Sequence, residues 1–197
     1  MDPKKLIGAV LIVAGIGAAL WYGGVLPPLV ERFIPVATPA EEKAGVATYA
    51  SVDHHLAFGY PDTFELREFP LKNGDTSWTA ITLADKKVLA EAEQNGASEG
   101  PPLIAIQVFD NPTNQSAKEW AEESKFSNFA LAVNGAMGSS TVAGVEGVGY
   151  IYSGLYTTDT VVIAHNGKIY MFLVDWITEE DQNRKTFDSI LSSVQFI

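Results

Sequence analysis

The N-terminal segment constrains this chain most, because its uncharged apolar run is long enough to cross a bilayer. Lys4 and Lys5 precede the run LIGAVLIVAGIGAALWYGGVL, which covers residues 6–26. A helix needs about 20 predominantly apolar residues to cross the hydrocarbon layer. A secretory signal has a shorter apolar stretch, roughly 7 to 15 residues, and ends at a cleavage site with small residues. We therefore predict a retained transmembrane signal anchor over residues 6–26. Because the run is rich in Gly and Ala, a cleaved leader is the alternative.

The charges that flank this run predict its orientation. Lys4 and Lys5 lie before it, whereas the nearest positive charge after it, Arg32, is offset by Glu31. Lys and Arg are retained preferentially on the cytoplasmic side. We therefore expect residues 1–5 in the cytoplasm and the C-terminal part outside it, in a single-pass protein of the cell membrane.

Small residues recur along the predicted membrane helix. Gly8, Gly15, Ala19 and Gly23 follow one another at spacings of seven, four and four, so they share one helical face. Such a face lets a second helix approach closely, which would allow membrane-helix packing and a homo-oligomer. The interpretation that we favour is that Gly and Ala are simply frequent in membrane helices.

The rest of the chain divides into a linker and one domain. Residues 27–50 contain Pro27, Pro28, Pro35 and Pro39, which predicts an extended stalk. Residues 51–197 then form an extracytoplasmic domain large enough to bury its own core.

Composition narrows the classes of function. The absence of cysteine excludes disulfides, thiolate nucleophiles and Cys-based zinc sites. The net charge of -11 argues against a nucleic-acid partner, since such proteins concentrate Lys and Arg. No cofactor is implied by any motif.

The sequence TVVIAHNGKIYMFLVDW, residues 160–176, predicts the clearest element. Asn166 and Gly167 tolerate the positive φ of a type I′ hairpin turn. Both arms carry apolar residues on both faces, whereas a sheet with one wet face alternates apolar and polar residues. The fold class is therefore α+β, with an antiparallel sheet covered by helices on both faces.

Three segments predict the helices. Asp85 is expected to cap a short one, and Ser116 with Glu119 fits a capping box before Trp120. For the last helix, Thr178 is the expected cap. Its core-facing residues follow at i, i+3, i+4 and i+7: Phe187, Ile190, Leu191 and Val194.

Several segments in this order resemble PsbP-like extracytoplasmic domains, which include the photosystem II extrinsic subunit and many anchored bacterial proteins. The segments are FGYPDTFEL, IAIQVFDNP, SAKEWAEE, GKIYMFLV and FDSILSSVQFI. The resemblance covers nearly all of residues 51–197 through packing motifs, and it implies an α/β/α sandwich outside the cytoplasm. Nothing marks photosynthetic partners, so that role is not carried over.

No catalytic or metal site is predicted. His54 and His55 would point to opposite faces of a strand, and a shared metal would need Asp53 or His165 from elsewhere. The sequence Asp110 to Ser116 does not match a calcium loop and is better explained as a turn into a capped helix.

The glycine-rich sequence GSSTVAGVEGVG lacks the P-loop ending, so Gly144, Gly147 and Gly149 are expected in turns or strand bulges. The tryptophans Trp78, Trp120 and Trp176 are expected in or near the core.

These features favour a membrane-anchored binding, accessory or scaffold module of an envelope assembly, with the bilayer and an unidentified protein as partners. Two alternatives stay open. One is a hydrolytic or metal-dependent enzyme with a cryptic site. The other is a structural subunit that assembles through its membrane helix.

Overall fold

The computed structural model describes residues 45–94 and 100–197. The predicted anchor at residues 6–26, its small-residue face and residues 27–44 of the predicted stalk lie outside these ranges. Among the described residues, no helix is both long and apolar enough to cross a membrane. The anchor therefore stays a prediction.

Seven antiparallel strands form the main sheet, in the order β3-β4-β5-β9-β8-β7-β6. All neighbouring pairs are antiparallel, which confirms the expected antiparallel sheet. The strands are β3 (Phe64–Asn73), β4 (Thr76–Asp85), β5 (Ile104–Asp110), β6 (Gly138–Val142), β7 (Val145–Ser153), β8 (Thr157–His165) and β9 (Lys168–Trp176).

A second, three-stranded sheet was not predicted. It consists of β1 (Val46–Ser51), β2 (Leu56–Pro61) and β10 (Gln195–Phe196), with β2 in the centre. β2 therefore pairs with β1 and with the C-terminal strand β10 rather than with the main sheet. The folded part also begins before the predicted boundary at Ser51, since β1 pairs along its whole length with β2.

Among residues 45–94 and 100–197, three α-helices accompany the sheets: α2 (Lys86–Gln94), α3 (Ala117–Glu123) and α4 (Gln182–Ser193). The Asp85 carboxylate accepts hydrogen bonds from the amides of Lys87 and Val88, as predicted. The capping box of Ser116 and Glu119 is also confirmed. Two 3-10 turns, Phe129–Leu131 and Val133–Gly135, follow α3.

The predicted start of the last helix is wrong. Its N-cap is Asp181 rather than Thr178. The Asp181 carboxylate instead accepts hydrogen bonds from the amides of Ile177 and Thr178 and from the Thr178 hydroxyl. Because this carboxylate closes a turn over the preceding residues, the helix begins after it.

The hairpin of β8 and β9 shows why the sheet is buried on both faces. Asn166 and Gly167 have φ values of 47° and 72°, as the predicted type I′ turn requires. Along β9, the side chains of Tyr170, Phe172 and Val174 enter one core. The intervening residues Ile169, Met171 and Leu173 enter a second core on the opposite face.

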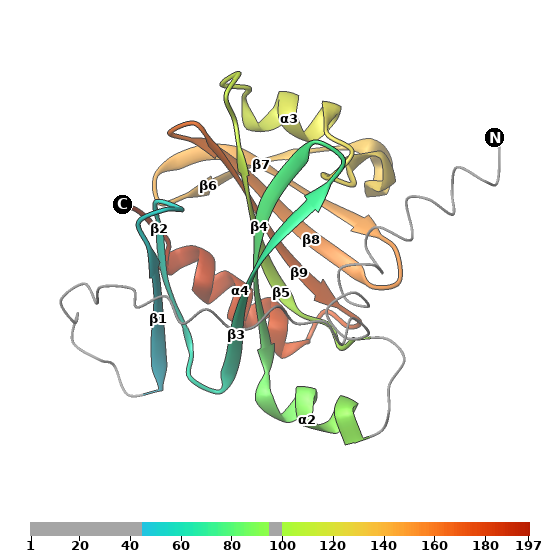
Figure 1. The fold of residues 1–197 in the computed structure, drawn as a ribbon. Coiled ribbons are helices and arrows are strands. Elements are labelled where there is room, and N and C mark those ends of the chain that lie inside the picture. Colours follow the sequence, from blue (N-terminus) through green and yellow to red (C-terminus); the bar gives the residue numbers. More distant parts are fainter. Residues whose placement is uncertain (1–44, 95–99) are drawn as a thin grey trace.

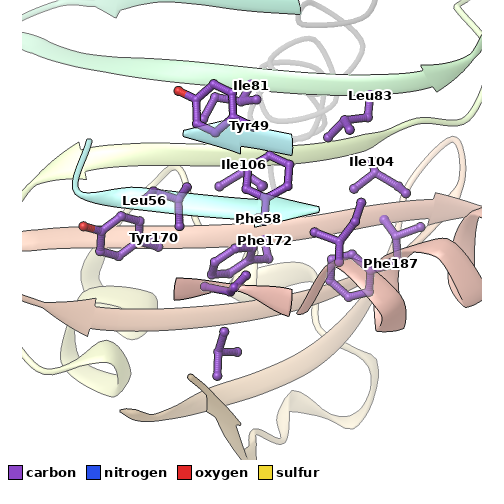
Figure 2. Packing of buried hydrophobic residues seen from close by; sticks show 14 of the residues in the cluster. Tyr49, Leu56, Phe58, Ile81, Leu83, Ile104, Ile106, Tyr170, Phe172 and Phe187 are labelled. Atoms are coloured by element: carbon purple, nitrogen blue, oxygen red, sulfur yellow. The ribbon is translucent and has the colours of Figure 1, made fainter. Parts of the chain in front are cut away.

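The two faces are covered by different elements (Figure 1). Trp120 and Ala121 of α3 pack into one core, and we call this side of the sheet the α3 face. Phe187 and Ile190 of α4 pack into the other core, on the side that we call the α4 face. The small sheet joins α4 there through buried residues such as Phe58 (Figure 2).

Candidate functional site

A row of polar side chains crosses one end of the α4 face. The register pairs Lys72 of β3 with Ser77 of β4, and Asp110 of β5 with Lys168 of β9. Trp78 pairs with Phe109, so Ser77 and Asp110 are the next residues along neighbouring strands. Alternation places the row on the face that carries Val108 and Tyr170, where strands lie about 4.8 Å apart.

The next row inward consists of Pro70, Thr79, Val108 and Tyr170. Here the chain leaves a hollow of about 340 Å³. Val108 is buried at its floor, whereas Lys72 and Ser77 are exposed at its rim. The residues that line the hollow are His54, Pro70, Leu71, Lys72, Ser77, Trp78, Thr79, Val108, Asp110 and Lys168.

His54 forms one wall and is held firmly. Its Nε2 lies 3.1 Å from Glu68 Oε1, and the Tyr49 hydroxyl donates to Glu68 Oε2 at 2.8 Å. The Tyr170 hydroxyl donates to the backbone carbonyl of His54 at 2.9 Å. These hydrogen bonds connect the turn between β1 and β2, which carries His54, to Glu68 of β3 and to Tyr170 of β9.

The network shifts the pKa values of its members in different directions. The hydrogen bond from His54 holds the pKa of Glu68 below its usual value, with a further contribution from the hydrogen bond of Tyr49. Burial raises the pKa of Tyr49, and it raises that of Tyr170 to about 12. Glu68 therefore stays ionised at neutral pH and both phenols stay protonated.

The charges of the row are only partly compensated. Lys168 Nζ lies 2.7 Å from Asp110 Oδ1, so these two groups satisfy one another. Within the described part of the chain, the side chains of Lys72, Ser77 and Thr79 make no hydrogen bond or ion pair. The hollow thus offers one ammonium group and two hydroxyls to a ligand.

The structure corrects the expected placement of two histidines. His54 and His55 lie in the turn between β1 and β2 and not on a strand, and His55 has a positive φ of 50°. Their rings still have different partners. The His54 ring contacts Glu68, whereas His55 Nδ1 lies 3.1 Å from the carbonyl oxygen of Ile197. The short turn places the two side chains on different partners.

His165, the third histidine, lies beside the hollow without lining it. It pairs in register with Lys168, and its ring packs against Phe196 with centroids 4.8 Å apart. Asp53 is exposed in the turn next to His54. Among residues 45–94 and 100–197, no group of three or more His, Asp or Glu side chains could hold a metal ion.

The segment from Asp110 to Ser116 is a turn that leads into α3, as predicted. The side-chain amide of Asn111 donates to the Gln115 carbonyl, and its oxygen accepts from the Gln115 amide. These two hydrogen bonds close the loop, so the Asn111 side-chain oxygen and the Gln115 carbonyl oxygen stabilise the turn.

The glycines of the GSSTVAGVEGVG sequence also serve the backbone. Gly144 has a φ of 79° in the turn between β6 and β7. Gly147 lies so close to β8 that a Cβ atom would approach the Val162 carbonyl oxygen to 2.2 Å. Gly149 has more room, since its nearest neighbour would be 3.5 Å away.

The tryptophans lie where the sequence predicts. Trp78 and Trp120 are buried on the α3 face, and Trp176 is half-buried. Trp176 Nε1 donates to Asp159, whose other oxygen pairs with Arg184, and the Arg184 guanidinium lies 4.5 Å from the Trp176 ring centroid. These aromatic side chains are structural.

Among the described residues, the lining of the hollow has no hydrogen-bonded pair of nucleophile and base. The His54 ring is directed to Glu68, and among the described residues no hydrogen bond joins it to Ser77 or Thr79. Sequence reasoning missed Glu68, Lys72 and Lys168 because their strands could not be aligned with one another. The signal that could have found them is the alternation of polar residues at the strand ends.

A scan of protein families and a search of curated proteins find no match for this chain. Its fold is similar to the solution structure of cyanobacterial PsbP (CyanoP) from Synechocystis, with a TM-score of 0.53 and 12% identity. The alignment covers 83% of this chain and 99% of that one. A crystal structure from Bacteroides thetaiotaomicron aligns over 76% of this chain and 48% of that one, with 9% identity and a TM-score of 0.44. The similarity to the CyanoP structure shows that the described domain has a PsbP-like fold.

Proposed function

We propose that this protein is a membrane-anchored accessory or scaffold module, whose PsbP-like domain stands outside the cytoplasm as part of an envelope assembly. The observation that carries the proposal is the combination of a PsbP-like fold with a lysine-led apolar segment before it. An anchor, a linker and a domain without paired catalytic groups together localise a surface.

The chain's own features supply the parts of such a module. Residues 6–26 would hold the protein in the bilayer, and Lys4 and Lys5 would keep the N-terminus in the cytoplasm. Residues 27–45 would carry the domain away from the lipid headgroups. The acidic balance of the chain, 24 Asp and Glu against 13 Lys and Arg, favours a solvated surface over attachment to anionic lipids.

Crosslinking of the full chain in its own membrane tests this function. After detergent extraction, we expect a crosslinked species that contains this protein and a different membrane or envelope protein in fixed proportion. A matched chain in which a cleavable secretory signal replaces residues 1–26 should lose that species. Recovery of the chain only as a soluble monomer would contradict the proposal.

The predicted helix-packing face gives a further outcome of the same experiment. If Gly8, Gly15, Ala19 and Gly23 join two copies of the chain, the crosslinked species is a homodimer. Gly15→Leu should then abolish it, whereas Gly17→Leu, on the opposite side of the helix, should not. A homodimer of this kind would favour the structural-subunit alternative over the accessory module.

A further inference from the structure

We propose that the hollow at the end of the α4 face is a binding site for a small organic anion. A carboxylate or phosphate group would bind at Lys72 and Ser77, and an apolar body would lie over Val108. This inference goes beyond the accessory role and does not depend on the membrane anchor.

The proposal rests on the polar groups of the lining that have no hydrogen-bond or ion-pair partner in the described part of the chain. Asp110, the carboxylate in the lining, is already paired with Lys168 at 2.7 Å. The groups without a partner in the described part of the chain are the Lys72 ammonium and the hydroxyls of Ser77 and Thr79. All three can donate hydrogen bonds, and one carries a full positive charge. This set complements an oxygen anion.

The charge balance of the hollow is opposite to that of the chain. Acidic residues outnumber Lys and Arg by 24 to 13 in the whole sequence. The lining of the hollow holds two lysines and one carboxylate. Lys168 is paired with Asp110, and the Glu68 carboxylate behind the lining is hydrogen-bonded to His54, so the Lys72 ammonium is the unpaired charge among the lining residues that an anion can approach.

The shape and rigidity of the hollow favour a small molecule. Its volume of about 340 Å³ lies at the lower end of the range for ligand pockets. Buried Val108 supplies an apolar floor, and Pro70 lies beside it. His54 is fixed by Glu68 and Tyr170, so the wall is formed before a ligand binds. Preorganisation of this kind reduces the entropy that binding costs.

The test uses the full chain in a neutral detergent, with 13C-labelled valine and threonine methyl groups. The probes are phenyl phosphate and benzoate, with neutral benzyl alcohol as the control for the ring alone. We expect saturable shifts of the Val108 and Thr79 methyl signals with one or both anions, and no saturable shift with benzyl alcohol. The stronger of the two anions identifies phosphate or carboxylate as the preferred group.

Two variants keep the test specific. Lys72→Gln should weaken binding of the preferred anion by roughly five- to tenfold, as expected for a charged hydrogen bond on the surface. Lys118→Gln removes the same charge from exposed α3, where Lys118 pairs with Glu122, and should change nothing. Equal weakening by both variants, equal shifts with benzyl alcohol, or no shift with either anion at about 10 mM would overturn the proposal.

Discussion

The two faces of the main sheet shift the pKa values of their acidic side chains in opposite directions. On the α3 face, Asp175 is desolvated and receives a hydrogen bond from the Thr158 hydroxyl at 2.7 Å. On the α4 face, Glu68 is held by His54 and Tyr49 and remains partly in contact with solvent. Burial raises the pKa of Asp175 to about 6, whereas the hydrogen bond from His54 lowers that of Glu68.

This difference follows from what covers each face. The α3 face is closed by a helix and aromatic side chains. The ring of Phe109 contacts the rings of both Trp78 and Trp120. The α4 face is closed by a helix and a small sheet, and the cover ends before the strands do. The open end of the α4 face therefore keeps polar groups available to a ligand.

The largest expected effect comes from truncating the cores on neighbouring residues of β9. Phe172 on the α4 face and Met171 on the α3 face are both almost fully buried. Phe172→Ala should lower the free energy of unfolding by about 4 kcal/mol, and Met171→Ala by about 3 kcal/mol, because each leaves a cavity. Urea unfolding followed by tryptophan fluorescence measures both. A loss under about 1 kcal/mol at Met171 would show that the α3 face is not a packed core.

The next largest effect is a difference in stability between alanine substitutions at two glycines of β7, Gly147 and Gly149. A Cβ atom at position 147 would lie 2.2 Å from the Val162 carbonyl oxygen, so the backbones of β7 and β8 would have to separate. Gly147→Ala should therefore cost about 3 kcal/mol in the free energy of unfolding. Gly149→Ala meets its nearest atom at 3.5 Å and is the matched control, with little change expected. Similar melting temperatures for the two variants would contradict the close approach of these strands.

Asp175 sets a pH dependence on the α3 face. Because the pKa of Asp175 in the folded protein lies above the ordinary value of 3.8, its contribution to stability is most favourable at low pH and declines as the pH rises from about 4 to 6. Asp175→Asn keeps an oxygen for the Thr158 hydroxyl but removes the charge. At pH 8 this variant should be about 3 kcal/mol more stable than the natural chain, and at pH 4 the two should be nearly equal. Urea titrations at both pH values measure the difference, and no gain at pH 8 would show that the carboxylate is well solvated.

Glu68 gives the opposite and smaller dependence on the α4 face. Its lowered pKa stabilises the fold above the ordinary value of 4.5, and this contribution is lost as the pH falls through the folded pKa. Glu68→Gln should cost about 1 kcal/mol at pH 7, since the side chain is 40% exposed and solvent screens its interactions. The loss should vanish below the folded pKa. A loss that is the same at pH 3 and pH 7 would mean that packing, not charge, accounts for it.

The elements with strong local signals were predictable from the sequence. The Asn166 and Gly167 turn, the capping box at Ser116 and the doubly apolar strands predicted the hairpin, α3 and the covered sheet, because each signal involves neighbouring residues. The small sheet was not predictable in this way. It joins β1 and β2 to β10, and a pairing over so long a separation leaves no local pattern.

The candidate site was less predictable for the same physical reason. His54, Asp110 and His165 were noticed as single residues, but the sequence does not tell which strands lie side by side. The register brings Lys72, near the end of β3, into one row with Lys168 at the start of β9. A row across four strands depends on the sheet order, which only the folded structure provides.

Digestion of intact cells with an external protease tests most directly whether the domain stands outside the cytoplasm on a retained anchor. The described domain begins with β1 at Val46, and the predicted stalk precedes it, so we expect cleavage between Pro28 and Gly45 and release of the intact domain. The membrane fraction should retain a fragment that begins with the lysine-led segment. Protection of residues 28–45 in intact cells, or a mature chain that starts after residue 26 in the soluble fraction, would contradict the proposed function.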